Sequence, residues 1–130
     1  MKELRLKKAV EGFLIARAAD GLSENSIAIN QWALSRLIDY TGNIELSKID
    51  LDILRSFMNH MRRVYVPKRS SGDRSPLAGS SVDRVWSSVR AFFSFAEVEY
   101  GTNRPDMRLP KPRYKTRVIK VFSQDDVRRC

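Results

Sequence analysis

The sequence predicts an all-α fold, a four-helix bundle followed by an extended basic linker. Three observations predict it. Apolar residues recur at spacings of three and four in four separate segments, as they do on the buried face of an amphipathic helix. Residues that favour helix ends, Ser, Asp and Gly, flank these segments. Positive charge gathers between and after the predicted helices.

The composition indicates one domain with a modest core. The chain has 130 residues, of which 42% are hydrophobic. No run of about 18 apolar residues predicts a membrane-spanning helix, and residues 1–8 lack the apolar segment of a signal peptide. Cys130 is the only cysteine, so neither an intramolecular disulfide nor a cysteine-based metal site can form. We expect a cytoplasmic protein that does not enter a membrane.

The net charge of +9 is unevenly distributed. Residues 62–79 carry five basic and one acidic side chain, and residues 100–120 carry seven basic and one acidic, whereas residues 1–61 are neutral overall. Clustered positive charge is typical of a protein that binds a polyanion. The alternative is that basic loops only aid solubility.

The first two helices are predicted from about Lys2 to Ala19 and from Ser23 to Gly42. Asp20 and Gly21 end the first helix, and the hydroxyl of Ser23 caps the second. Asn30 lies on the mostly apolar side of the second helix, where we interpret it as a hydrogen-bonded polar group at the edge of the core.

The third helix is predicted to begin after Asp50 as N-cap and to end near Arg62 or Arg63. Residues 64–79 contain two prolines, two glycines and three serines, without a helical period. A loop of this length in a small domain is usually either functional or disordered.

The fourth helix is predicted over residues 80–100, with Ser80 or Ser81 as N-cap and Gly101 at its end. Its apolar side buries valine and phenylalanine. Its outer side could present donors to phosphates or base edges, or could simply be solvated; that side includes Arg84, Ser87, Ser88, Arg90 and Ser94. Trp86 has no evident role.

Three domains or segments follow from these elements: a helical domain at residues 1–103, a linker at 104–120 and the start of a second domain at 121–130. Prolines at positions 105, 110 and 112 argue against a helix in the linker and favour an extended chain. Residues 123–126 (Ser-Gln-Asp-Asp) are typical of a helix start.

The order of these features resembles the N-terminal core-binding (SAM-like) domain of tyrosine recombinases, the phage integrase family. The similar segments are residues 21–27 (Gly-Leu-Ser-Glu-Asn-Ser-Ile), 46–57, 81–84 (Ser-Val-Asp-Arg), 89–96 and 121–127. Asn30 departs from the family pattern, in which an aromatic residue is common there. Ser26 replaces a common threonine, and the loop at 64–79 is longer than usual.

The resemblance implies half of a C-shaped clamp around duplex DNA, with the second and fourth helices at the major groove. By position, the DNA contacts on the helices would be Ser23, Asn25, Ser26, Ser80, Ser81, Arg84, Ser87 and Ser88. Helix starts and hydroxyl groups suit phosphates, and arginine can read guanine. Basic residues of the loop and linker would bind phosphates; these are Lys68, Arg69, Arg74, Lys111, Arg113, Lys115 and Arg117.

We therefore expect a DNA-binding fragment of a site-specific recombinase that acts in DNA integration and recombination. Its partners would be double-stranded DNA and, on DNA, other recombinase protomers; the chain would be a monomer when free. The resemblance places the catalytic residues after the linker, so we predict no catalytic, metal or cofactor site here. The pattern His-x-x-Arg at His60–Arg63 is interpreted as coincidence.

Two rival functions remain at this stage. A free-standing helical interaction module could bind an acidic protein partner through the same basic segments. A single-strand or RNA binder is the other, although the phenylalanines fall on core stripes and not on an exposed stacking surface.

Overall fold

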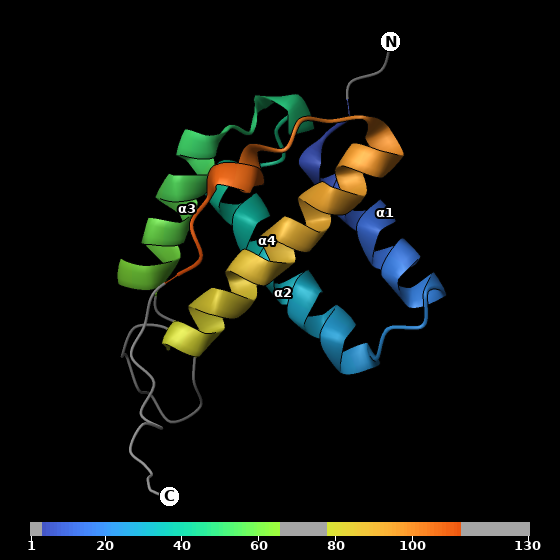
Figure 1. Ribbon diagram of the computed structural model, residues 1–130, viewed down its shortest axis with the longest axis horizontal. Helices are drawn as coiled ribbons and strands as arrows, with labels where there is room; N and C mark the ends of the chain where they lie inside the picture. The colour runs from blue at the N-terminus through green and yellow to red at the C-terminus, as the bar shows by residue number, and fades with distance from the viewer. Residues whose placement is uncertain (1–3, 66–77, 113–130) are drawn as a thin grey trace, which may run out of the picture.

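The computed structural model describes residues 4–65 and 78–112 and shows an all-α fold (Figure 1). The helices within these ranges are α1 (Leu6–Ala19), α2 (Glu24–Thr41), α3 (Leu51–Arg63) and α4 (Gly79–Tyr100), with short 3₁₀ turns η1 (Leu46–Lys48) and η2 (Pro105–Arg108). The described residues form no strand beyond an isolated antiparallel bridge between Arg5 and Glu45. The predicted all-α class is confirmed.

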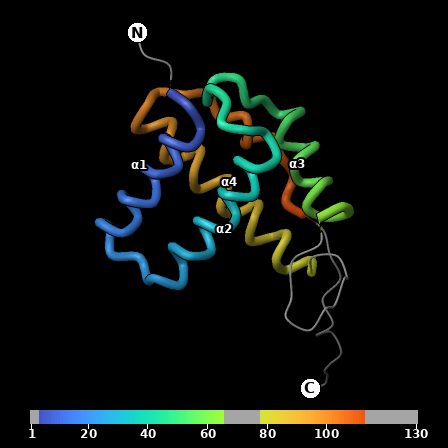
Figure 2. Tube along the Cα trace, turned by 180° about the vertical axis from the view of Figure 1, so that it is seen from behind, coloured from blue at the N-terminus to red at the C-terminus, as the bar shows by residue number. Residues whose placement is uncertain are grey.

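Helix α4 lies at the centre of the bundle and contacts α1, α2, α3 and η2 (Figure 1). Figure 2, the view from behind, shows that α2 packs beside α1 and lies across the back of α4. The buried face of α4 includes Val85, Val89 and Phe92, spaced as one stripe of a helix. Phe92 meets Phe13 of α1 edge-to-face, with ring centroids 5.7 Å apart. Burial of this stripe from three sides makes α4 the main packing element.

Local signals set most helix ends. The Ser23 hydroxyl accepts a hydrogen bond from the backbone N–H of Ser26 at 3.2 Å, and the Asp50 carboxylate accepts one from Ile53 at 2.9 Å. Both predicted N-caps are therefore confirmed. Gly101 ends α4 with φ of 70°, in the left-handed region that glycine adopts without strain.

The start of α1 differs from the prediction of Lys2. Leu4 and Arg5 are not helical, because their backbone pairs with the segment before η1. The Leu6 N–H donates to the Ile44 carbonyl, and the Leu46 N–H donates to the Leu4 carbonyl, both at 2.8 Å. Because of this pairing, α1 begins at Leu6. The predicted helix start was therefore wrong for Leu4 and Arg5, which lie outside the helix.

The predicted N-cap of α4 is also wrong. The cap is Ala78, whose side chain cannot form a capping hydrogen bond. The backbone N–H groups of Ser81 and Val82 both bond to the Ala78 carbonyl at 3.0 Å, which closes the first turn. Ser80 and Ser81 therefore lie inside the helix.

The extended linker predicted from residue 104 is wrong for Pro105–Arg108. This segment is the 3₁₀ turn η2, which packs against α3 and α4. Proline fits the first turn of a helical segment because its missing N–H would have no partner there. Two later side chains, Asp106 and Leu109, are buried. The helical domain therefore extends past residue 103.

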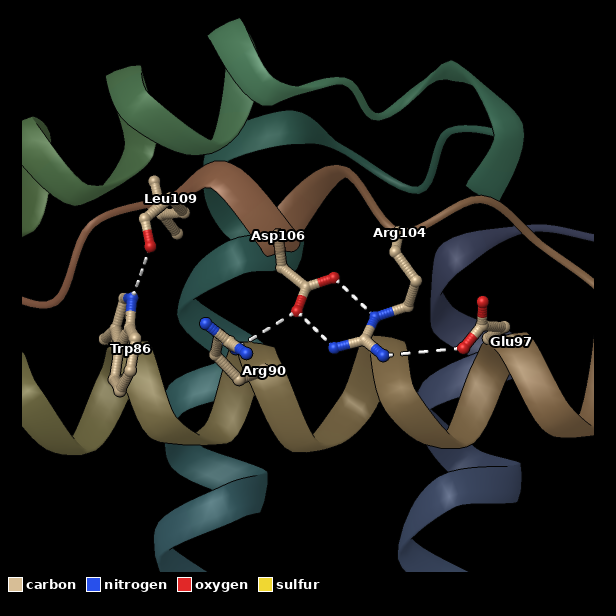
Figure 3. Close-up of polar contacts among 6 residues, drawn as sticks. All are labelled: Trp86, Arg90, Glu97, Arg104, Asp106 and Leu109. Atoms are coloured by element: carbon tan, nitrogen blue, oxygen red, sulfur yellow. Dashed lines mark hydrogen bonds and ion pairs between the residues drawn. The ribbon is translucent and has the colours of Figure 1, made fainter.

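An ion-pair network fastens η2 to α4 (Figure 3). Arg104 donates two hydrogen bonds to the fully buried Asp106, Nε to Oδ1 at 2.8 Å and Nη2 to Oδ2 at 2.7 Å. Arg90 adds an ion pair to Asp106 at 3.4 Å, and Arg104 also lies 3.5 Å from Glu97. The hydrogen bonding of its guanidinium to the Asp106 carboxylate raises the pKa of Arg104, which stays charged.

Trp86, whose role the sequence left open, holds the segment after η2. Its indole Nε1 donates to the Leu109 carbonyl at 3.1 Å (Figure 3). The guanidinium of Arg90 lies over its ring, 5.2 Å from the centroid. The position of the chain at residue 109 is thus fixed relative to α4.

Candidate nucleic-acid interface

One edge of the bundle gathers the starts of α2 and α4 and the end of α3. Both views place the starts of α2 and α4 at the lower border of the bundle, away from the marked N-terminus, and the end of α3 points toward the same border (Figures 1 and 2). We call this side the lower edge. Helix starts expose backbone N–H groups without helical partners and carry partial positive charge. Two helix starts at one edge therefore favour an anionic ligand there.

A groove between α2 and α4, with a volume of about 210 Å³, brings several predicted residues together. We call it the α2–α4 groove; its polar lining is Arg17, Ser26, Asn30, Arg84, Ser87 and Ser88. Three of the predicted contacts, Ser26, Arg84 and Ser87, come from two helices that are distant in sequence. The fold places them around one cavity, which the sequence could only suggest.

Arg84 and Ser87 are exposed on α4. Arg84 has no ion pair or hydrogen bond with any residue that the structure describes. A guanidinium carries five N–H donors in a planar fork, suited to a phosphate or to a guanine edge. Its charge is available to a ligand at this groove.

The position of Ser88 differs from the one predicted for a DNA contact. Its side chain is 3% exposed, and its hydroxyl donates to Oδ1 of Asn30 at 2.9 Å. This bond joins α2 to α4 inside the bundle, so the hydroxyl is used by the fold. The prediction that Ser88 contacts DNA is wrong. The interpretation of Asn30 as a hydrogen-bonded residue of the core edge is confirmed.

The start of α2 contributes one hydroxyl to the cap and one to the groove. The Ser23 hydroxyl accepts from the Ser26 N–H and donates to Oγ of Ser26 at 3.1 Å. Ser23 therefore serves mainly as the N-cap. Asn25 is exposed at the start of α2 but does not line the groove, whereas Ser26 does.

Arg17 is a groove residue that the sequence analysis missed. It lies in the last turn of α1, and its guanidinium carbon is 5.3 Å from the centroid of the Phe13 ring. Its Nε is buried and has no hydrogen-bond partner among the described residues. A basic residue in the last turn of the predicted first helix, close in sequence to the start of the second, was the signal that could have identified it.

The other predicted residues divide into two groups. Ser80 is exposed and Ser81 half-buried in the first turns of α4, and the Lys111 ammonium lies 4.0 Å from Oδ1 of Asp83. Six predicted phosphate contacts lie outside the described residues, as does the predicted domain start at 121–130; they are Lys68, Arg69, Arg74, Arg113, Lys115 and Arg117.

The described residues contain neither a metal-binding cluster nor a membrane-spanning helix. In residues 4–65 and 78–112, no group of three or more His, Cys, Asp and Glu side chains could hold a metal ion. His60 packs beside Tyr40 at the end of α3, with ring centroids 5.1 Å apart. Among these same residues, every helix is too short or too polar to span a bilayer.

Comparisons with protein families, with curated proteins and with solved structures give no match.

Proposed function

We propose that this chain binds duplex DNA, with the starts of α2 and α4 at the major groove. The observation that carries the proposal is the α2–α4 groove, which unites Ser26, Arg84 and Ser87 with Arg17 beside the start of α2. Two arginines and two hydroxyl groups around one groove are donors, and DNA presents acceptors on its phosphates and base edges. The net charge of +9 adds a favourable long-range attraction.

We further propose that the chain is the DNA-binding part of a site-specific tyrosine recombinase that acts in DNA integration and recombination. The support is the sequence resemblance to core-binding domains, together with the four-helix fold that this resemblance led us to expect. Within such a recombinase, this chain would hold the duplex, would contact other protomers on DNA and would leave strand cleavage to a separate catalytic domain.

The first experiment measures fluorescence anisotropy of labelled nucleic acids with the full chain at several salt concentrations. The probes are a duplex DNA, one of its single strands and a duplex RNA of the same length. We expect the tightest binding to duplex DNA and a steep loss of affinity with salt, because binding releases counterions from phosphates. A lack of duplex binding at low salt would contradict the proposal, as would a preference for the single strand or the RNA.

Arg84→Ala tests the groove itself. If Arg84 reads a base, its loss should weaken duplex binding by about 1–3 kcal/mol. The matched control is Lys48→Ala, which removes the same charge from the exposed end of η1 at the opposite edge of the bundle. Equal effects of the two substitutions would mean that only net charge matters and that Arg84 does not contact DNA.

A further inference from the structure

We propose that a second basic groove, between α3 and the start of α4, binds the phosphates of the opposite strand of the same duplex. This inference rests on the proposed function. The groove has a volume of about 380 Å³, and we call it the α3–α4 groove. Its basic lining residues are Arg55, Arg62, Arg63 and Lys111.

The charge of this groove favours an anion. Its described lining includes four basic side chains and no acidic one. The ion pair of Arg55 is open to solvent, because Arg55 lies 3.8 Å from Asp52, whose side chain is 90% exposed. Lys111, 64% exposed, lies 4.0 Å from Oδ1 of Asp83, whose side chain is 22% exposed. The exposed Arg55–Asp52 pair is weak, and Lys111 lies at the outer limit of ion-pair distance from Asp83, so a phosphate can compete for both cations.

The floor of the groove gives the cations a fixed frame. Val82 and Leu109 form part of it and are both buried. Leu109 is held in place by the hydrogen bond from Trp86, and Asp106 anchors the preceding turn. Lys111 follows two residues later, so its backbone begins from a fixed position. The groove can thus bind its ligand with little reordering of the described chain.

The two grooves lie on opposite sides of the first turns of α4. Val82 lines the α3–α4 groove, whereas Arg84 and Ser87 line the α2–α4 groove. A helix is about 10–12 Å in diameter, and the DNA major groove is about 12 Å wide between its two phosphate strands. With the start of α4 in the major groove, cations on its two sides face different strands.

This arrangement favours duplex DNA over an acidic protein segment. A protein segment in the α3–α4 groove would account for four cations on one side of α4 only. It would leave Arg17 and Arg84 on the other side without a ligand. One duplex accounts for both sets, because its two strands run along both walls of the groove that α4 enters.

The test is the salt dependence of duplex binding by Arg62→Ala/Arg63→Ala in the full chain. If both side chains neutralise phosphates, the slope of log affinity against log salt should decrease by about two. The matched control is Lys7→Ala/Lys8→Ala, which removes the same charge from exposed positions at the start of α1, at the opposite edge. Because Arg62 makes intramolecular contacts, the exposed Lys111→Ala is a third variant, expected to decrease the slope by about one.

The outcomes separate this inference from the proposed function. Failure of the unmodified chain to bind duplex DNA overturns both. Normal duplex binding with an unchanged slope in Arg62→Ala/Arg63→Ala and in Lys111→Ala overturns only the second groove, as does an equal change in the Lys7/Lys8 control. The same variants are also measured against poly-glutamate, which represents an acidic protein segment. If they lose poly-glutamate binding while duplex binding stays intact, the groove belongs to an acidic protein segment instead.

A combined variant tests whether the grooves act on different phosphates. Arg84→Ala joined to Arg62→Ala/Arg63→Ala should lose affinity by the product of the separate fold-changes, because distant sites without shared partners act independently. If the combined variant loses no more affinity than the more strongly affected of its two component variants, both grooves bind the same phosphates. That result would overturn the two-strand geometry.

Discussion

At the residue scale, Ser87 and Ser88 show how neighbours of the same type take different roles. Successive residues of a helix are turned by roughly 100° about its axis. That rotation leaves Ser87 exposed in the α2–α4 groove and buries Ser88 against Asn30 of α2. Because Asn30 supplies a buried acceptor, a polar residue at position 88 belongs to the core. Polarity alone could not separate the two serines.

Ser88→Ala should lower the free energy of unfolding by about 1–3 kcal/mol, because it leaves the buried Oδ1 of Asn30 without this donor. Ser87→Ala, at an exposed position, should change stability by less than about 0.5 kcal/mol. Urea denaturation of both variants measures the difference. Equal stabilities would show that the Ser88–Asn30 bond contributes nothing.

Three arginines, Arg84 and Arg90 of α4 and Arg104 just before η2, show the same difference for charged side chains. Arg90 and Arg104 pair with the buried Asp106, whereas Arg84 has no partner among the described residues. The sequence placed Arg84 and Arg90 on the same outer face. Only the packing of η2 assigns Arg90 to the fold and leaves Arg84 available to a ligand.

At the element scale, α2 and α4 begin with almost the same backbone but different caps. The N-cap of α2, Ser23, has φ and ψ of −66° and 152°, and the N-cap of α4, Ala78, has −63° and 150°. Ser23 forms a side-chain cap and Ala78 cannot. The start of α4 therefore leaves N–H groups that a bound phosphate could satisfy.

Ala78→Ser should raise the free energy of unfolding by about 1 kcal/mol, because its hydroxyl can adopt the capping geometry of Ser23. Thermal or urea denaturation measures the gain. Ser80→Ala is the control and should have little effect, since Ser80 lies inside the helix. Loss of stability in Ser80→Ala with no gain in Ala78→Ser would restore Ser80 as the cap.

At the scale of the whole molecule, the part of the bundle that the structure describes continues past α4 and includes η2. Asp106 is enclosed by Arg90 and Arg104, and Leu109 is buried where Trp86 holds its carbonyl (Figure 3). These contacts close the core between α3 and α4 and position the α3–α4 groove. The boundary predicted at residue 103 would cut through this unit.

A chain of residues 1–112 should unfold with the same midpoint in urea as the full chain, because the described core ends at Leu109. A chain of residues 1–103 should lose about 1.5–3 kcal/mol, since it lacks the apolar burial of Leu109. Asp106 and Arg104 are removed together, and Arg90, which loses its partner, remains accessible to solvent. Circular dichroism during denaturation compares the two. Equal midpoints would place the domain boundary at residue 103.

The sequence by itself determined the elements that depend on local interactions. The periodic apolar stripes predicted four helices, and the caps at Ser23 and Asp50 are correct because each bond spans only three residues. It also identified Arg84 and Ser87 as exposed donors of α4. These features follow from contacts within one or two turns, which are visible as spacing.

The tertiary structure alone decided the features that depend on residues distant in sequence. The Ser88–Asn30 bond joins positions 58 residues apart, and the Trp86–Leu109 bond joins positions 23 apart. The inclusion of Arg17 in the α2–α4 groove, and the burial of Asp106 in a segment predicted to be extended, follow from helix packing. A periodic pattern shows which face of a helix is buried; which partner meets it is set by the packing of the whole bundle.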